Sequence, residues 1–387
     1  MGHHCLRVHL CFGDWLFWRR AGGFHYRGGL GTWPEWLERF LLKNGVTEIV
    51  LLGEQRDHHK AAVALAKKHN MHVTVTEWGY LRPDWITFER DGMSGNTCFT
   101  KDPDEIAQIA EGLPEPDFEV RYPDSFFQLA VNGLVADVGT WVFGFLYPGY
   151  RCHLLMNPLA LYICTGLRKW KAARNSEQAN SRVKALADAA ERSPYFMFPM
   201  QIEADFQVRA YSKYTGLESA LRDVIGSFAL HAPTSRRLII KVHPMDPGVR
   251  PWKRIVARIA SEYKAEARVE LIDGGSFGEL ATRSSGVVTI NSTCGVEAIM
   301  TGVPVKTLGE SLYDIPGLTF QGALDHFWSK AEPPKTPLRQ QYISAIAACI
   351  QIKGGFFSAE GLKALVEDAA IRLDKGMVNF PLMKQQV

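Results

Sequence analysis

Two basic side chains, Lys241 and His243, stand at the end of a β-branched run of the sequence. Residues 237–242 are predicted to form a strand, and Pro244 and Pro247 restrict the turn that follows it. A histidine at a strand end can hold a phosphate or donate a proton to a leaving group. The segment is therefore a candidate phosphate site, although a purely structural histidine fits the same pattern.

A second candidate anion site lies between residues 286 and 305. The apolar run 287–290 leads into Asn291, Ser292 and Thr293, whose side chains suit the N-cap of the helix that follows. Backbone N–H groups and the two hydroxyls would converge there on a phosphate. Glu297, about one turn into the helix, could accept hydrogen bonds from sugar hydroxyls. An ordinary capped helix with a surface glutamate explains the spacing equally well.

Polar and apolar residues alternate in the segment Met200-Gln201-Ile202-Glu203-Ala204-Asp205-Phe206-Gln207. If the segment is extended, Gln201, Glu203, Asp205 and Gln207 share one face. Carboxylates in this position could serve as nucleophile or base. The residues alone do not distinguish Glu203 from Asp205, and a charged edge strand or a helix start would give the same pattern.

The first half of the chain adds two acidic candidates and one arginine. Glu77 and Arg82 follow an expected strand that ends at Thr76, and Asp14 follows the first expected strand. We expect them to face the same cleft as the groups of the second half. The segment Asp102-Pro103-Asp104 matches a metal-binding pattern of other sugar transferases, but it is also typical of helix capping. We therefore predict no metal site.

Alternating strands and helices must position these groups. Strands are expected at residues 8–11, 48–52, 72–76, 237–242, 268–272, 287–290 and 303–307. Helices are expected at residues 34–43, 58–69, 252–263, 276–282, 295–300, 338–350 and 359–373. Strand, helix and strand with short connections predict parallel sheets whose ligands lie at the carboxyl ends of the strands.

The predicted fold class is α/β, with two facing Rossmann-like domains. The expected parts are an N-terminal Rossmann-like domain at residues 1–165, a helical bridge at 166–192, a C-terminal Rossmann-like domain at 193–335 and C-terminal helices at 336–387 that pack back on the domains. The length of 387 residues suits two domains. The net charge, 44 − 41 = +3, is too small for a protein that coats nucleic acid.

Compartment and membrane contact can also be predicted. Seven scattered cysteines and the lack of a signal peptide indicate a reducing compartment. The apolar segment 126–150 contains Asp137, so we expect it to be buried or interfacial rather than membrane-spanning. The basic run from Arg168 to Arg174 contains Trp170 and could rest on anionic lipid, although a solvated helix face would carry the same residues.

Six motifs together resemble the capsule polysaccharide biosynthesis proteins of the KpsS and KpsC type. In chain order they are GDWLFW, YRG, EWGYLRPDWIT, PMQIEADFQVR, KVHPMDPG and NSTCGVEAIMTGVPV. The single-copy length is more similar to the KpsS type than to the two-module KpsC type. The resemblance implies a GT-B-like, metal-independent, retaining glycosyltransferase that uses CMP-β-Kdo as donor and needs no cofactor.

The resemblance also implies an acceptor and partners. The acceptor would be a (lyso)phosphatidylglycerol-type lipid at the cytoplasmic face of the inner membrane, where the first β-Kdo starts the poly-Kdo linker of the capsule. Other capsule assembly proteins are possible partners, and nucleic acid is not expected. Two alternatives stay open: a different CMP-sugar or nucleotide-sugar transferase acting on a soluble glycan, and a non-catalytic assembly or export component.

Residue roles follow from the same resemblance. Asp205 would be the nucleophile, Glu77 the acid/base, and His243 a catalytic group at the leaving phosphate. Trp78 stands where family members often carry a second acid, which weakens the case for paired carboxylates there. The remaining predicted substrate-binding residues are Lys241, Ser292 and Thr293 for the phosphate, Glu297 for the ribose, and Gln201, Arg82 and Asp14.

Overall fold

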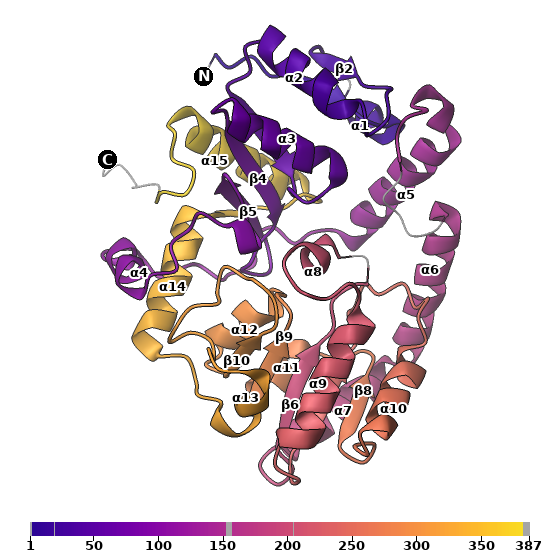
Figure 1. The fold of residues 1–387 in the computed structure, drawn as a ribbon, viewed down its shortest axis with the longest axis vertical. Coiled ribbons are helices and arrows are strands. Elements are labelled where there is room, and N and C mark those ends of the chain that lie inside the picture. The colour runs from indigo at the N-terminus through magenta and orange to yellow at the C-terminus, as the bar shows by residue number, and fades with distance from the viewer. Residues whose placement is uncertain (1, 19, 152–156, 204, 382–387) are drawn as a thin grey trace. The chain divides into compact units, whose positions relative to one another are not determined.

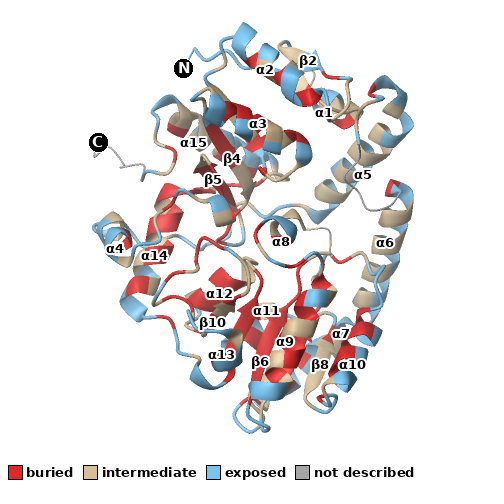
Figure 2. Ribbon diagram, in the orientation of Figure 1, coloured by how far each residue is buried: buried red, intermediate tan, exposed pale blue. Residues whose placement is uncertain are grey.

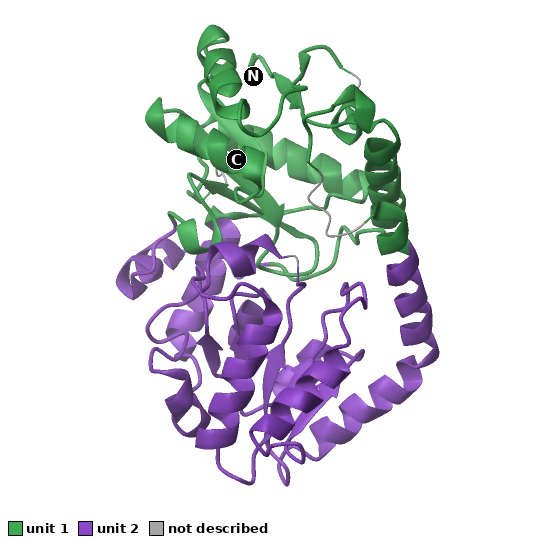
Figure 3. Ribbon diagram, turned by 45° about the vertical axis from the view of Figure 1, so that its right-hand side comes forward, with its two compact units in different colours: residues 1–98, 117–162, 349–387 green, residues 99–116, 163–348 purple. Residues whose placement is uncertain are grey.

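The computed structural model divides the chain into two compact units, shown in green and purple in Figure 3. Unit 1 comprises Met1–Cys98, Asp117–Tyr162 and Cys349–Val387, and unit 2 comprises Phe99–Pro116 and Ile163–Ala348. The structure describes residues 2–18, 20–151, 157–203 and 205–381. Residue 204 of the candidate loop and residues 152–156 therefore lie outside the description.

Unit 2 is built on a parallel five-stranded sheet in the order β10-β9-β6-β7-β8 (Figure 1). Its strands are β6 (Tyr195–Pro199), β7 (Arg237–Lys241), β8 (Val269–Ile272), β9 (Gly286–Thr289) and β10 (Val305–Thr307). The chain proceeds outward from β6 through β7 to β8, then returns to the other side of β6 for β9 and β10. The strand order thus reverses between β6 and β9. At such a point the loops that follow the two strands run in opposite directions and leave space for a ligand.

The helices of unit 2 surround this sheet. They are α4 (Pro103–Ala110), α6 (Pro158–Arg174, whose first residues belong to unit 1), α7 (Ser176–Asp188), α8 (Phe206–Ala210), α9 (Leu217–His231), α10 (Trp252–Glu262), α11 (Phe277–Thr282), α12 (Cys294–Met300), α13 (Leu324–Lys330) and α14 (Thr336–Cys349). The alternation of strands and helices confirms the α/β fold class.

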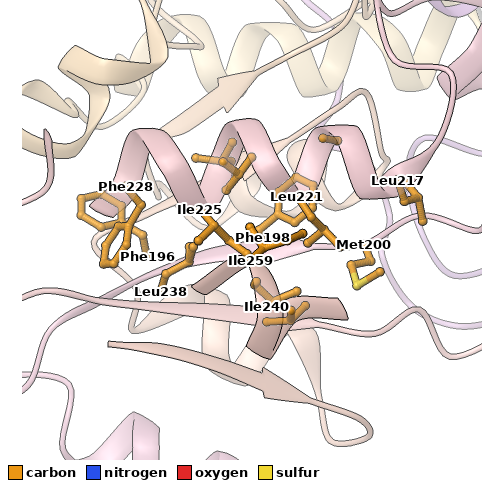
Figure 4. Packing of buried hydrophobic residues seen from close by; sticks show 14 of the residues in the cluster. Phe196, Phe198, Met200, Leu217, Leu221, Ile225, Phe228, Leu238, Ile240 and Ile259 are labelled. Atoms are coloured by element: carbon orange, nitrogen blue, oxygen red, sulfur yellow. The ribbon is translucent and has the colours of Figure 1, made fainter. Parts of the chain in front are cut away.

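Apolar side chains at helical spacing explain why α9 packs on this sheet. Leu221, Ile225 and Phe228 lie on one face of the helix and are fully buried. Figure 4 shows this face against Phe198 of β6 and Ile240 of β7. Every residue of β6 is buried, as expected for a central parallel strand covered on both faces. The core holds the carboxyl ends of β6, β7 and β9 in place.

Unit 1 contains a mixed sheet in the order β11-β5-β4-β3. Its strands are β3 (Glu48–Leu52), β4 (His72–Trp78), β5 (Trp85–Arg90) and β11 (Gln351–Lys353). The pair β3 and β4 is parallel and is joined through α3 (Asp57–Lys68), which confirms the strand-helix-strand prediction there. The strands β5 and β11 are antiparallel additions that the sequence pattern did not indicate.

The first expected strand lies outside this sheet. It is β1 (Arg7–His9), and it pairs in parallel with β2 (Gly23–His25) in a separate two-stranded sheet. The other elements of unit 1 are α1 (Phe12–Phe17), α2 (Trp33–Lys43), η1 (Ser94–Asn96), α5 (Phe126–Val142), η2 (Gly144–Leu146) and α15 (Ala359–Asp374).

The helix α5 contains no buried residue, as Figure 2 shows. Residues 126–150 were expected to be buried or interfacial, and burial is ruled out for this helix, whereas an interfacial position stays a prediction. One side of it meets α1, where the Gly13 N–H donates to Thr140 at 3.0 Å and Phe12 stacks on Phe143 at 4.4 Å between centroids. Much of its apolar surface stays exposed. Among the described residues, no helix has the length and apolar character needed to cross a bilayer.

The C-terminal segment belongs to both units. Its α14 lies almost wholly in unit 2, whereas β11 and α15 complete the core of unit 1. There Ile352, Leu365 and Val378 pack with Ile86 and Phe88 of β5. The chain therefore forms unit 1 from segments at both ends of the sequence.

We expect Arg372→Ala to destabilise unit 1 strongly. Arg372 of α15 is only 4 % exposed, donates to the carbonyl of Cys349 at 2.9 Å and pairs with Asp368 at 2.6 Å. Its removal leaves buried acceptors unpaired, so the free energy of unfolding should fall by about 3 kcal/mol in urea titrations. The control Arg258→Ala removes exposed ion pairs with Glu218 and Glu262 and should cost less than about 1 kcal/mol. Equal small losses in both variants would contradict this.

Candidate active site

The loops after β6 and β9 meet at the switch point of the unit 2 sheet. Gln201 is only 6 % exposed, and its Nε2 donates to Asp205 Oδ2 at 3.3 Å and to Asn291 Oδ1 at 2.9 Å. The Asn291 side chain donates in turn to the carbonyl of Gln207 at 3.0 Å. Gln201 thus joins the two loops and orients the carboxylate of Asp205.

The extended segment expected around Asp205 is not present. The strand β6 ends at Pro199, and Asp205 is the N-cap of α8, accepting from the Gln207 N–H at 2.9 Å. Aspartate favours this position because its carboxylate satisfies a free N–H of the first helical turn. Gln201, Glu203, Asp205 and Gln207 therefore do not share one strand face. Of the alternatives that the sequence left open, the helix start is the one observed, and the extended segment is not.

The two carboxylates of this loop have different surroundings. Glu203 accepts from the backbone N–H of Leu217 at 3.4 Å, at the start of α9. Asp205 lies in the hydrogen-bond network of Gln201 and Asn291. Burial raises the pKa of Asp205, while hydrogen bonds from the Gln207 N–H and the Gln201 amide and the charge of Arg209 act in the opposite direction. Asp205 is thus a desolvated carboxylate with its ionised form supported by donors.

Lys241 and His243 lie at the carboxyl end of β7, next to this loop. The Met200 N–H donates to the carbonyl of Lys241 at 2.9 Å, which places the two loop starts side by side. Lys241 is 4 % exposed and donates to the carbonyl of Gly274 at 2.9 Å. Burial lowers its pKa, an effect opposed by nearby Cys294 and Asp273. Because Cys294 is the first residue of α12, Lys241 lies near the start of that helix.

The ring of His243 has a defined tautomer when neutral. Its Nδ1 accepts the backbone N–H of Met245 at 3.0 Å. The proton of the neutral imidazole therefore resides on Nε2. A histidine in this form presents a donor, as an oxygen of a phosphate requires.

Arg168 holds the loop that contains His243. From α6 its guanidinium donates to the carbonyls of His243, Pro244 and Asp246 at 3.2, 3.1 and 2.6 Å. It also pairs with Asp273 at 2.6 Å, and its side chain is only 13 % exposed. The guanidinium of Arg168 is therefore occupied by this loop, while contact of the basic run with lipid stays one of two open alternatives. Trp170 of the same run is exposed.

The predicted phosphate-binding hydroxyls lie just before α12. Ser292 Oγ accepts the backbone N–H of Cys294 at 3.3 Å, and Tyr313 donates to the Ser292 carbonyl at 2.6 Å. Thr293 is the N-cap but makes no side-chain capping bond. Glu297 is exposed in the first turn. Unit 2 therefore brings Gln201, Asp205 and Lys241 together beside this turn.

The acidic candidates of unit 1 lie on different elements. Glu77 is inside β4 rather than after it, and its Oε1 accepts the Trp78 N–H at 3.1 Å. Asp14 lies in α1 and accepts from the backbone N–H of Leu10 at 2.9 Å and from Arg7 at 3.1 Å. Asp14 follows β1 and Glu77 lies within β4, and these two strands belong to separate sheets.

Arg82 is exposed in the loop between β4 and β5. Its guanidinium carbon lies 5.9 Å from the centroid of the Trp78 ring. The cleft that these groups were expected to share with unit 2 stays a prediction.

The capping interpretation of Asp102 is confirmed. Its carboxylate accepts from the backbone N–H groups of Asp104 and Glu105 at 2.8 and 3.4 Å, at the start of α4. In the described part of the chain, no three His, Cys, Asp or Glu side chains are grouped so that they could hold a metal ion.

Comparison with known proteins shows the family. The family model described as "Capsule polysaccharide biosynthesis protein" matches residues 47–357. The chain belongs to this family. The resemblance drawn from the six motifs is thereby confirmed, and the capsule biosynthesis family covers both the Glu77 strand and the switch-point loops.

Family relatives match over most of their length. The Escherichia coli capsule polysaccharide export protein KpsS is 27 % identical over 92 % of this chain and 91 % of its own. The capsule polysaccharide modification protein LipB of Neisseria meningitidis serogroup B is 29 % identical over 84 % of this chain and 78 % of its own. A solved structure of Thermosulfurimonas dismutans KpsC, beta Kdo 2,4 transferase, matches with a TM-score of 0.42 and 15 % identity over 95 % of this chain and 98 % of that one.

Sequence reasoning missed two residues of this candidate site. Asn291 was considered only as part of a helix cap, and Arg168 only as a surface charge. In a parallel sheet whose strand order reverses once, the loops after β6 and β9 lie side by side. Considering these two loops together would have indicated Asn291. No local signal indicated Arg168, since its partners are loop carbonyls and Asp273, which lie 75 or more positions away in the sequence.

Proposed function

We propose that this protein is a retaining glycosyltransferase that transfers β-Kdo from CMP-β-Kdo to a (lyso)phosphatidylglycerol-type lipid and so starts the poly-Kdo linker of the capsule. The observation that carries the proposal is the desolvated Asp205 carboxylate, held by Gln201 at the switch point beside Lys241. The family resemblance supplies the sugar, the donor and the acceptor.

The first step uses Asp205 as nucleophile. Its carboxylate oxygen attacks the anomeric carbon of Kdo, the bond from that carbon to the phosphate oxygen breaks, and CMP leaves with the electron pair. Lys241 and the Nε2–H of His243 would stabilise the negative charge on the departing phosphate, which is chemistry that needs no metal ion. A covalent glycosyl ester remains on Asp205.

The second step uses the acceptor. Glu77 would take the proton of the lipid hydroxyl, whose oxygen attacks the anomeric carbon and displaces the Asp205 carboxylate. Two inversions return the starting β configuration. The proposal therefore assigns the nucleophile to unit 2 and the acid/base to unit 1.

The direct test is a transfer assay. Purified protein given CMP-β-Kdo and fluorescent lysophosphatidylglycerol should form a mono-Kdo lipid with EDTA present, detected by mass increase of the lipid. Activity confined to a soluble glycan would favour the nucleotide-sugar transferase alternative. Donor binding without turnover on any acceptor would favour the export component, the role in the printed name of the E. coli relative.

The pH dependence of transfer should report Asp205. The nucleophile must be ionised, so transfer is expected to be lost as the pH falls through the raised pKa of Asp205. In Gln201→Leu the carboxylate loses a donor that favours its ionised form, so its pKa rises further and the acid limb of kcat/KM moves to higher pH. Gln207→Leu is the control, because the Gln207 backbone N–H is the donor to Asp205 and is kept. Identical acid limbs in both variants would remove Gln201 from this role.

A further inference from the structure

A pocket in unit 1 is formed by the two-stranded sheet and α1. It has a volume of about 490 Å³ and lies within the segment that contains the GDWLFW motif. His9 and His25 are register partners on β1 and β2, with ring centroids 5.1 Å apart. None of the six described residues that line it is acidic; they are His9, Trp15, Trp18, Arg20, Gly23 and His25.

Two polar atoms of this pocket are buried without a hydrogen bond. They are Trp18 Nε1 and His9 Nδ1, for which the described residues provide no partner. His9 itself is only 1 % exposed. A buried polar atom without a partner costs about 1 to 3 kcal/mol, which a ligand atom can offset. An indole N–H and a guanidinium can only donate, so the ligand must present acceptor oxygens.

The charge of the pocket favours an anion. Arg20 supplies a cation, and the nearest carboxylate, that of Asp14, is already engaged by Arg7 and by the backbone N–H groups of Leu10 and Cys11. His25 is linked to Tyr147, with 2.7 Å between Nδ1 and the phenol oxygen. A phosphate group matches this combination of one cation and several donors.

An apolar face continues from the pocket. Trp15 lines the pocket and is itself exposed, and its ring lies 5.4 Å from that of Phe12. Phe12 stacks on Phe143, whose ring lies 6.3 Å from that of Phe145. We define this apolar face by six of the exposed apolar side chains on α1, α5 and η2, which are Trp15, Phe17, Phe127, Trp141, Val142 and Phe145.

The composition of the face favours lipid over a protein partner. Exposed Trp and Phe side chains beside a cation are typical of surfaces that enter the headgroup region of a bilayer. Asp137 is the acidic residue of α5, and the Tyr162 hydroxyl donates to it at 3.0 Å. The apolar face and the anion pocket are continuous through Trp15.

We propose that the pocket binds the phosphodiester headgroup of a membrane phospholipid while the apolar face rests in the same leaflet. This inference rests on the proposed function, because it places the lipid acceptor of that reaction on unit 1. The headgroup phosphate would accept from Trp18 Nε1 and pair with Arg20, and the acyl chains would lie along Phe143 and Phe145.

The pocket is tested by binding of the full-length protein to vesicles without donor sugar. Arg20→Gln should weaken binding to phosphatidylglycerol vesicles in co-sedimentation about tenfold, and Trp18→Phe should weaken it several-fold. Arg39→Gln is the control, because it removes an equal charge from the exposed surface of α2 and should leave binding unchanged. Equal effects of Arg20→Gln and Arg39→Gln would overturn the headgroup assignment. Inorganic phosphate bound by the wild type and lost in Arg20→Gln, with vesicle binding intact, would also overturn it.

The apolar face has its own matched pair of variants. Phe145→Ser should reduce vesicle binding about tenfold, whereas Phe380→Ser, which changes another exposed phenylalanine of unit 1, should not. If Phe145→Ser instead changes the oligomeric state in solution and leaves vesicle binding intact, the face contacts protein and the proposal is wrong.

The two proposals can fail separately. Suppose that the wild type forms mono-Kdo lipid, but Arg20→Gln, Trp18→Phe and Phe145→Ser bind vesicles as well as the wild type does. That result would overturn this inference and leave the proposed function standing. Pocket-dependent vesicle binding without any transfer of Kdo would support this inference and overturn the function.

Discussion

Asp205→Asn is expected to lower sugar transfer by roughly four to six orders of magnitude, as loss of a covalent nucleophile does in other enzymes. Asparagine is a good N-cap and can still accept the Gln207 N–H, so α8 should form normally. The amide cannot form the glycosyl ester, however. Transfer is measured with CMP-β-Kdo and the fluorescent lipid, and CMP affinity by calorimetry.

The matched control is Glu203→Gln in the same loop. Glu203 accepts a backbone N–H at the start of α9, and glutamine can keep that bond. Its transfer rate should stay within about threefold of the wild type, since glutamine keeps an acceptor for the same N–H and a single hydrogen bond contributes about 1 kcal/mol. CMP affinity should be unchanged in both variants. A Glu203→Gln defect as large as that of Asp205→Asn, or full activity of Asp205→Asn, would remove Asp205 as nucleophile.

Glu77→Gln is expected to slow the second half of the reaction by about 10² to 10⁴-fold, the usual contribution of a general base. Glutamine cannot take the proton of the acceptor hydroxyl, whereas the attack of Asp205 on the donor does not need Glu77. One equivalent of CMP should therefore be released quickly, and the Kdo ester on the protein should accumulate. Rapid-quench measurement of CMP and intact-protein mass spectrometry detect the two events.

Glu35→Gln provides the comparison for this variant. Glu35 lies on α2, and its side chain is 74 % exposed. It should transfer Kdo at the wild-type rate and show no accumulated ester. If Glu77→Gln releases no CMP at all, Glu77 acts before the ester forms, and its assignment to the acceptor step is wrong.

Local pattern was sufficient for β7 to β10 and for α10 to α12 of unit 2, whereas β6 and α9 were not predicted. Short apolar runs such as that of β7 alternate with amphipathic helices such as α10. A parallel sheet covered by helices is one of the few folds that buries such runs. In unit 1, the strand β3 likewise begins and ends at the predicted residues. Lys241 and His243 were placed correctly at a strand end for the same reason.

Contacts between distant segments could not be predicted in this way. Gln351 pairs with Thr87 across the sheet of unit 1, and nothing near either residue indicates the other. Gln201 and Asn291 are likewise 90 positions apart, so only the strand order brings them together. The sequence left open whether Asp205 lies on a strand or at a helix start, because polar alternation does not distinguish a strand from a cap followed by one short helix.

The discontinuity of unit 1 has a consequence for synthesis on the ribosome. Its strands β3, β4 and β5 emerge early, but β11 and α15 are translated last. Until then, Ile86 and Phe88 lack the side chains of Ile352 and Leu365 that cover them. Nearly all of unit 2 is a continuous stretch, so it can complete its sheet first, because domains fold as units as they are made. Unit 1, whose first strands are translated first, is thus the unit that completes its fold last. Until β11 has been made, the edge of β5 must stay shielded from other nascent chains.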